Sequence, residues 1–216
     1  MNKVDAFLKH ERKLKRALIV TCVLCGTLST ELLQPVFAGK GSVKGNSVPV
    51  TMLTPAEVTD LLFMREEEKL ARDVYHAMHE LYGQRVFTNI ARAEQRHMDA
   101  ILGLLDAYGL NDPCKEAGRF GNQELQKLYD MLVARGRKSR EEAFLIGALI
   151  EEVDIADLME AMAHTDKDEI HSVYSALLGG SKRHLNAFVR NYESVSQKTY
   201  QAQNLMQEQV DEIMGR

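Results

Sequence analysis

Hydrophobic residues recur at helical spacing along the chain from about residue 53 onward, and they predict an all-α protein. Thr54-Pro55-Ala56-Glu57 is typical of a capping box with proline at the first helical position, so we expect a helix from there to about Leu81. Gly83 ends this helix, and a second helix is expected over about 86–108. The short connection predicts that the two helices pack antiparallel.

The second half of the chain predicts two more long helices after a long connection. We expect a loop over 109–122, a short helix over about 123–135, a third long helix from the Ser139-Arg140-Glu141-Glu142 capping box to about Met162, and a fourth over about 168–192 capped by Asp166. The fourth helix must pass Gly179-Gly180, which favours a kink or break there. Two helices, a long crossover and two more helices favour an up-down-down-up four-helix bundle.

The first 38 residues are typical of an export signal. Basic residues precede an apolar run from Ala17 to Leu28, and Val36-Phe37-Ala38 predicts cleavage before Gly39. The apolar run is short for a membrane span. We therefore expect a periplasmic or secreted protein with no stable membrane span after signal removal, the alternative being an uncleaved anchor.

The rest of the chain divides into a linker, one helical domain and a tail. Residues 39–52 are small and polar, which is typical of a linker, and residues 53–193 form the helical domain. Residues 194–216 are polar and weakly amphipathic, so we expect a loose helix or a frayed tail.

Charge and cysteine content argue against nucleic-acid binding and against an intrachain disulfide. The formal charge is −4, and removing residues 1–38, with six basic and three acidic side chains, changes it to −7, so nucleic acid is not an expected partner. Cys114 is then the single cysteine, which excludes an intrachain disulfide. No neighbour in the sequence activates Cys114 as a nucleophile.

Glu94 and His97 are the most informative residues, because they lie in the middle of the apolar side of the second helix. That side is otherwise formed by residues such as Ile90 and Ile101. A carboxylate in such a place must be paired, protonated or bound to a metal. A glutamate and a histidine one turn apart also form the chelating pair of di-iron helical bundles.

The other long helices carry polar residues on their apolar faces too. On the fourth helix, Ser181 and His184 fall within the apolar face. On the third, an inner face of Leu145, Ala148, Ile155 and Met159 places Glu152 nearer its centre than Glu151.

The first helix contains three consecutive glutamates, so at least one must lean inward. Periodicity places Glu67 closest to the centre, while Glu68 shares a stripe with Met64, Ala71 and Tyr75. The charge run 65–69 as a whole is interpreted as mostly a solvated face, and Tyr75 and Tyr174 as packing residues.

One carboxylate from the first helix, with Glu94, His97, Glu152 and His184, gives three carboxylates and two imidazoles. Oxygen and nitrogen donors without thiolate suit iron or manganese, with zinc as an alternative. A lone buried histidine is usually a satisfied core residue, but polar groups on the inner faces of all four long helices predict a metal site.

Two stretches of the sequence resemble the ferritin-like superfamily. Phe87 to His97 (FTNIARAEQRH) is similar to the second helix of rubrerythrin-type proteins, and Glu68 to Tyr75 (EKLARDVY) to their first. More closely, Met64 to Asp73 (MREEEKLARD) with Gly180 to Leu185 (GSKRHL) resembles the bacterial and archaeal domain-of-unknown-function 2202 family. The resemblance covers about residues 53–192.

The resemblance implies a ferritin-like four-helix bundle that holds two metal ions, usually iron. It implies Glu68, Glu94, His97, Glu152 and His184 as the ligands, and on its basis we prefer Glu68 and keep Glu67 in reserve. A manganese pair or a single metal ion remain alternatives.

Position 181 departs from the superfamily pattern. The fourth helix usually carries a second Glu-x-x-His, but here Ser181 occupies the place of the glutamate. Three carboxylates then offset only three of the four charges of two divalent ions. An exogenous anion, an inward-turned Glu151 or a single metal would each resolve this.

These features favour a metal-dependent oxidoreductase that acts on peroxide, dioxygen or ferrous iron, with a small oxidant as its partner. The alternatives are a non-catalytic iron-buffering or metal-binding protein, and an interaction module with a degenerate metal site. Fold alone does not decide among them. The sequence leaves open whether the chain forms a homodimer.

Overall fold

The computed structural model describes residues 52–216, in which every regular element is a helix. The helices are α2 (Pro55–Tyr82), α3 (Arg85–Ala107), α4 (Gln123–Gly136), α5 (Arg140–Met162), α6 (Asp168–Ser196) and α7 (Gln207–Met214). The all-α prediction is confirmed for this part of the chain. The predicted signal 1–38 and all of the predicted linker except Met52 lie outside the described residues.

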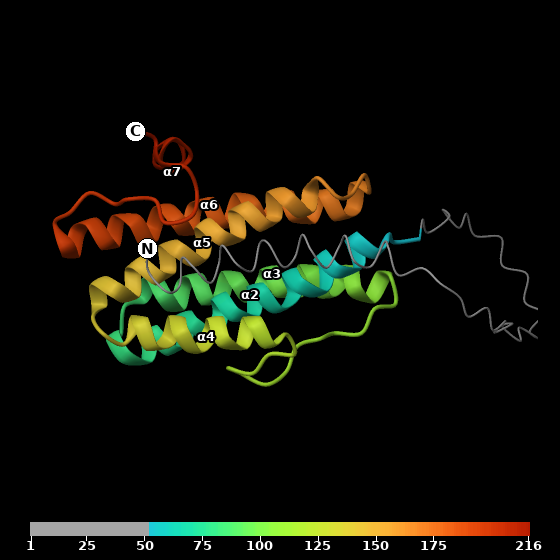
Figure 1. Cartoon of the computed structure of the whole chain (residues 1–216), viewed down its shortest axis with the longest axis horizontal. Coiled ribbons are helices and arrows are strands. Elements are labelled where there is room, and N and C mark those ends of the chain that lie inside the picture. The colour runs from blue at the N-terminus through green and yellow to red at the C-terminus, as the bar shows by residue number, and fades with distance from the viewer. Residues whose placement is uncertain (1–51) are drawn as a thin grey trace, which may run out of the picture.

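The four long helices pack as two antiparallel pairs. The first pair is α2 with α3 and the second is α5 with α6, while the shorter α4 packs against both α2 and α5 (Figure 1). Contacts of α2 with α5 and of α3 with α6 join the pairs. Within residues 52–216, no helix is both long and apolar enough to cross a membrane.

Capping interactions fix most of the predicted helix ends. The Thr54 hydroxyl accepts a hydrogen bond from the Glu57 amide at 3.2 Å, and the Glu57 carboxylate accepts one from the Thr54 amide at 2.7 Å. Gly83 ends α2 in the left-handed conformation, with φ of 63°, which favours glycine. The Ser139 hydroxyl similarly accepts a hydrogen bond from the Glu142 amide at the start of α5.

The fourth long helix, α6, begins at Asp168 as predicted, but its predicted cap and interruption are wrong. The N-cap is Lys167 rather than Asp166, and the Lys167 ammonium lies 2.8 Å from the carboxylate of Glu57. The helix then continues through Gly179-Gly180 to Ser196 without a break. Its long contact with α5 supports the helix across both glycines.

The charge run 65–69 is buried rather than solvated. The residues from Arg65 to Lys69 are between 1 % and 5 % exposed. The connection between α3 and α4 contacts Arg65, Glu66 and Lys69, whereas Glu68 faces His97 of α3. Arg65 forms an ion pair with Asp112 at 2.7 Å, and backbone amides of Gly121 and Asn122 donate to Glu66. Lys69 lies over the Phe120 ring, with Nζ 4.1 Å from its centroid.

Helix α5 is buried on nearly every side. It contacts α6 on one side and α2 and α4 on the other, so fifteen of its residues are buried. Met159, expected on the inner face, is instead 48 % exposed. With apolar residues all round, the sequence of α5 gives no reliable inner face.

The C-terminal segment is packed onto the helices rather than frayed. Tyr200 and Val210 are fully buried, and Val210 belongs to α7, which contacts α6. The Tyr200 ring meets that of Tyr192 edge-on, with centroids 5.8 Å apart. The expected polar tail 194–216 therefore contributes to the hydrophobic core.

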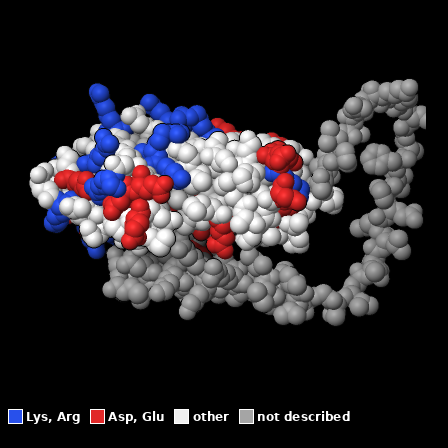
Figure 2. Space-filling model, turned by 90° about the horizontal axis from the view of Figure 1, so that it is seen from above, with Lys and Arg blue, Asp and Glu red and all other residues white. Residues whose placement is uncertain are grey.

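The outer surface carries charges of both signs. Figure 2 shows acidic and basic side chains gathered towards the two ends of one face, with a largely uncharged stretch between them. The basic side chains at one end are interspersed with acidic ones. This face therefore has no uniformly basic surface of the kind that binds nucleic acid.

The Glu57–Lys167 ion pair predicts an acid-sensitive contribution to stability. Burial opposes ionisation of Glu57, but contacts with Lys167, Thr165 and Thr54 lower its pKa to about 2. The contribution is therefore present above the unfolded-state pKa of about 4.5 and is lost as the pH falls to about 2. Glu57→Gln should lower the free energy of unfolding by about 3 kcal/mol at pH 7, with the difference vanishing near pH 2.

Urea unfolding of both proteins across this pH range measures the effect. Glu80→Gln, on the exposed side of the same helix, is the control and should change stability by less than about 0.5 kcal/mol. A pH-independent loss in Glu57→Gln would contradict the ionic origin.

Candidate metal centre

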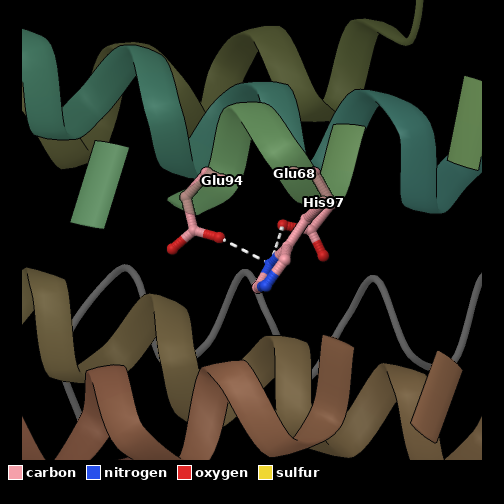
Figure 3. A group of neighbouring side chains, drawn as sticks. All are labelled: Glu68, Glu94 and His97. Carbon is pink, nitrogen blue, oxygen red and sulfur yellow. Dashed lines mark hydrogen bonds and ion pairs between the residues drawn. The ribbon is translucent and has the colours of Figure 1, made fainter. Parts of the chain in front are cut away.

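The Glu94-His97 pair of α3 faces α2 in the interior. Nδ1 of His97 lies 2.8 Å from Oε2 of Glu94 and 3.2 Å from Oε2 of Glu68, which α2 supplies (Figure 3). One turn of helix separates Glu94 from His97, so both side chains leave α3 on the same side. Glu68, Glu94 and His97 present ligand atoms within 4.8 Å of one another.

A second group of three side chains lies beside the first. Nδ1 of His184, on α6, is 2.9 Å from Oε1 of Glu94 and 3.5 Å from Oε2 of Glu151, on α5. Glu94, Glu151 and His184 again present ligand atoms within 4.8 Å of one another. Glu94 therefore belongs to both groups, with one carboxylate oxygen directed to each histidine.

The two groups are shielded from solvent on their carboxylate side. The side chains of Glu68, Glu94 and Glu151 are at most 2 % exposed, whereas those of His97 and His184 are 13 % and 11 % exposed. The two imidazole rings lie roughly parallel, with centroids 5.5 Å apart. Solvent thus approaches the site from the imidazole edge.

Electrostatic coupling keeps Glu94 charged. Burial raises its pKa, but the contacts with His184 and His97 outweigh burial and lower the pKa to about 2. Burial also opposes charge on the imidazoles, yet the nearby carboxylates raise the pKa of His97 to about 11 and that of His184 to about 10. Protons on the two imidazoles thus offset the buried negative charge.

The pKa values of Glu68 and Glu151 are raised, in contrast to that of Glu94. Burial raises the pKa of Glu68 and of Glu151 to about 7 each, and repulsion from the charge of Glu94 adds to this rise. Three buried carboxylates thus face two imidazoles, and burial disfavours their simultaneous ionisation unless protons or a cation compensate them.

The structure distinguishes Glu68 from Glu67 on α2. Glu68 joins the first group of ligands. Glu67 instead lines a small cavity of about 20 Å³ between α2, α4 and α5, together with Leu70, Leu125, Leu128, Leu132, Ile150 and Val153. The resemblance-based preference for Glu68 therefore agrees with the geometry, and the periodicity-based preference for Glu67 does not.

The structure reverses the preference for Glu152 over Glu151. Glu151 faces His184, whereas Glu152 faces the C-terminal segment and is fully buried there. Its carboxylate accepts hydrogen bonds from the Tyr200 hydroxyl at 2.6 Å and from the backbone amides of Gln203, Asn204 and Leu205 at 3.0, 2.5 and 2.8 Å. Because α5 is covered on both sides, apolar periodicity does not separate these neighbours.

Tyr75 positions Glu151. The Tyr75 hydroxyl donates a hydrogen bond to Oε1 of Glu151 at 2.5 Å and is fully buried. Burial and the neighbouring carboxylates raise the pKa of Tyr75, so it remains a donor at neutral pH. Tyr75 therefore packs, as expected, and also orients a candidate ligand.

Comparison with known proteins supports the resemblance to the domain-of-unknown-function 2202 family. The family model described as "Uncharacterized protein domain (DUF2202)" matches residues 57–216. The chain belongs to this family. The match includes the C-terminal segment that the structure packs against α5 and α6.

A relative of this DUF2202 protein has the same architecture. "Uncharacterized protein MJ0754" from Methanocaldococcus jannaschii is 42 % identical over 175 residues, which are 79 % of this chain and 92 % of the relative. The crystal structure titled "hypothetical protein MJ0754" superposes with a TM-score of 0.75 at 41 % identity and covers 79 % of this chain and 98 % of that chain.

In this DUF2202 chain, the absence of a side chain at Gly180 leaves room for the imidazole ring of His97. A Cβ at position 180 would lie 2.5 Å from Nε2 of His97, far inside van der Waals contact. The ring has little freedom to move, because Glu94 and Glu68 hold its other nitrogen. At Gly179 a Cβ would meet only Nη1 of Arg183, at 3.6 Å.

The two glycines make a matched pair of variants. Gly180→Ala should displace the His97 ring and weaken Mn²⁺ binding at least tenfold, while α6 remains folded. Gly179→Ala should keep wild-type affinity and gain up to about 1 kcal/mol of stability, because alanine favours helix. Circular dichroism and equilibrium dialysis with Mn²⁺ measure both effects, and equal affinities in the two variants would contradict the role of Gly180.

Glu151 and Glu152 of α5 provide a second matched pair of variants. Glu152→Gln should lower the free energy of unfolding by about 2 kcal/mol, because its hydrogen bonds to the C-terminal segment lose their charge. Glu151→Gln should leave that segment in place. Hydrogen exchange at the amides of residues 203–205 distinguishes them, and equal protection in both variants would contradict the assignment.

Proposed function

We propose that this DUF2202 chain is an exported ferritin-like protein whose four long helices form a four-helix bundle around a pair of iron or manganese ions. We further propose that it is an oxidoreductase acting on peroxide, dioxygen or ferrous iron. The domain 53–193, with the packed C-terminal segment, would act outside the cytoplasm.

The observation that carries the proposal is the sharing of Glu94 between two groups of three potential ligands. Glu68 and His97 complete one group, and Glu151 and His184 complete the other. A carboxylate with one oxygen in each group suits a bridging ligand between two ions. Contributions from all four long helices match the arrangement of di-metal carboxylate bundles.

The donor atoms fit such ions. Three carboxylates and two imidazoles without thiolate are typical of iron and manganese sites. Three ligand atoms, Oε1 of Glu68, Oε1 of Glu94 and Nδ1 of His184, are buried without a hydrogen bond of acceptable geometry. The last two lie 2.9 Å apart but are not aligned as donor and acceptor, which suits ligation of a common ion.

Cys114 does not compete as the reactive group. It is a free, partly buried thiol, and burial raises its pKa to about 12. Thiolate is therefore scarce at neutral pH, so thiol chemistry at this residue is not favoured.

The chemistry divides between the ions and the protein. Redox-active ions, when bound, would supply the electrons that reduce dioxygen or peroxide. Glu68, Glu94 and Glu151 would hold such ions in a water-poor interior, and Tyr75 orients Glu151. Since only the imidazole edge is partly exposed, the substrate must be small.

Metal content and peroxide turnover test the proposal. Protein loaded anaerobically with Fe²⁺ should contain about two ions per chain and show a near-ultraviolet band that changes when peroxide is added. Glu94→Ala removes the shared carboxylate, so both ions and at least about 99 % of peroxide consumption should be lost. Elemental analysis and a peroxide assay measure these outcomes.

Glu152→Gln is the control, because its carboxylate is buried next to Glu151 but bound to the C-terminal segment. It should retain both ions and turnover. Tight metal binding without peroxide consumption would contradict catalysis and favour iron buffering. Wild-type protein with no bound metal, and with melting unchanged by added iron, would contradict the metal centre altogether.

A further inference from the structure

Ser181 contributes no ligand to the centre. It lies one turn before His184 on α6 and is fully buried, but its hydroxyl donates to the Leu177 carbonyl of its own helix at 3.0 Å. Helix α6 therefore supplies an imidazole without the carboxylate that α3 supplies beside His97. With Glu68, Glu94 and Glu151, the site has three carboxylates for a pair of divalent ions.

Asp154 is a further buried carboxylate on α5. It follows Glu151 by three residues on α5, so the two side chains leave the helix on the same side. It is 5 % exposed, and its carboxylate interacts electrostatically with those of Glu68 on α2 and Glu151. The hydroxyl of Ser181 on α6 is within hydrogen-bonding reach.

One oxygen of the Asp154 carboxylate has no hydrogen-bond donor among residues 52–216. Its Oδ1 is buried and accepts no hydrogen bond within the described part of the chain. The charged groups that interact most strongly with it, Glu68, Glu67 and Glu151, are all acidic. A buried carboxylate among other carboxylates is costly unless a cation joins them.

We propose that Asp154 is the fourth carboxylate ligand of the centre, supplied by α5 in place of the one that Ser181 does not supply from α6. This inference rests on the proposed metal centre. Four carboxylates balance the four charges of two divalent ions, so no exogenous anion is required. The small side chain of Ser181 leaves room for the carboxylate of Asp154 beside α6.

Moving the carboxylate between helices tests the inference. The variants are Asp154→Asn and the double variant Asp154→Ala with Ser181→Glu, and the probe is Mn²⁺ under equilibrium dialysis with electron paramagnetic resonance. Asp154→Asn should bind the second ion at least tenfold more weakly than wild type. The double variant should recover the second ion, because it returns a carboxylate to the site from α6.

The melting temperature in EDTA distinguishes a metal ligand from a residue that stabilises the fold. A carboxylate that serves only the ions adds nothing to the metal-free fold, so Asp154→Asn should melt at the same temperature as wild type or higher. Excess Mn²⁺ should raise the Tm of wild type more than that of the variant. A lower metal-free Tm in Asp154→Asn would overturn the inference, because Asp154 would then stabilise the fold itself.

The outcomes separate this inference from the proposed function. Wild-type protein that binds two ions while Asp154→Asn binds both with unchanged affinity overturns the role of Asp154 and leaves the centre intact. Failure of a normally folded double variant to recover the second ion also overturns it. Wild-type protein that binds no Mn²⁺ or Fe²⁺ overturns the centre, and with it the inference.

Discussion

The carboxylate of Glu94 between two imidazoles is the interaction around which the interior is arranged. It lies 2.8 Å from His97 and 2.9 Å from His184, so it links α3 to α6 across the two helix pairs. Glu68 and Glu151 reach the same pair of rings from α2 and α5. Because separated charges are costly in a dry interior, this polar cluster restricts how the four long helices can be aligned.

Burial of acidic groups continues outward from this cluster along α2 and α5. On α2 the connection between α3 and α4 covers Arg65 and Lys69: Arg65 pairs with Asp112, and the Lys69 ammonium donates to the Arg119 carbonyl. On α5 the acidic Glu152 is covered by the C-terminal segment. The irregular parts of the chain thus supply the backbone amides and counter-charges that the helices lack.

The sequence predicts the helices better than the directions in which they face. Capping boxes at Thr54 and Ser139 mark true helix starts, because such caps are local. Burial by segments distant in the sequence is not a local property. Because α5 is covered on all sides, its apolar periodicity selects Glu152 rather than Glu151 as the inward-facing residue. The polar composition of the C-terminal segment likewise gives no sign that Tyr200 is buried. The apolar pattern also gives no signal for Asp154, the ligand that we propose, although its spacing of three residues from Glu151 repeats that of Glu94 and His97.

The hydrogen bonds from the backbone amides of residues 203–205 to Glu152 have a consequence for biosynthesis. Residue 152 leaves the ribosome about 50 residues before its hydrogen-bonding partners, since translation runs from the N-terminus at roughly 5–20 residues per second. During that interval the carboxylate of Glu152 on α5 lacks these hydrogen-bond donors. The contact can therefore form only after residues 203–205 have been synthesised, and truncation before residue 203 would remove it.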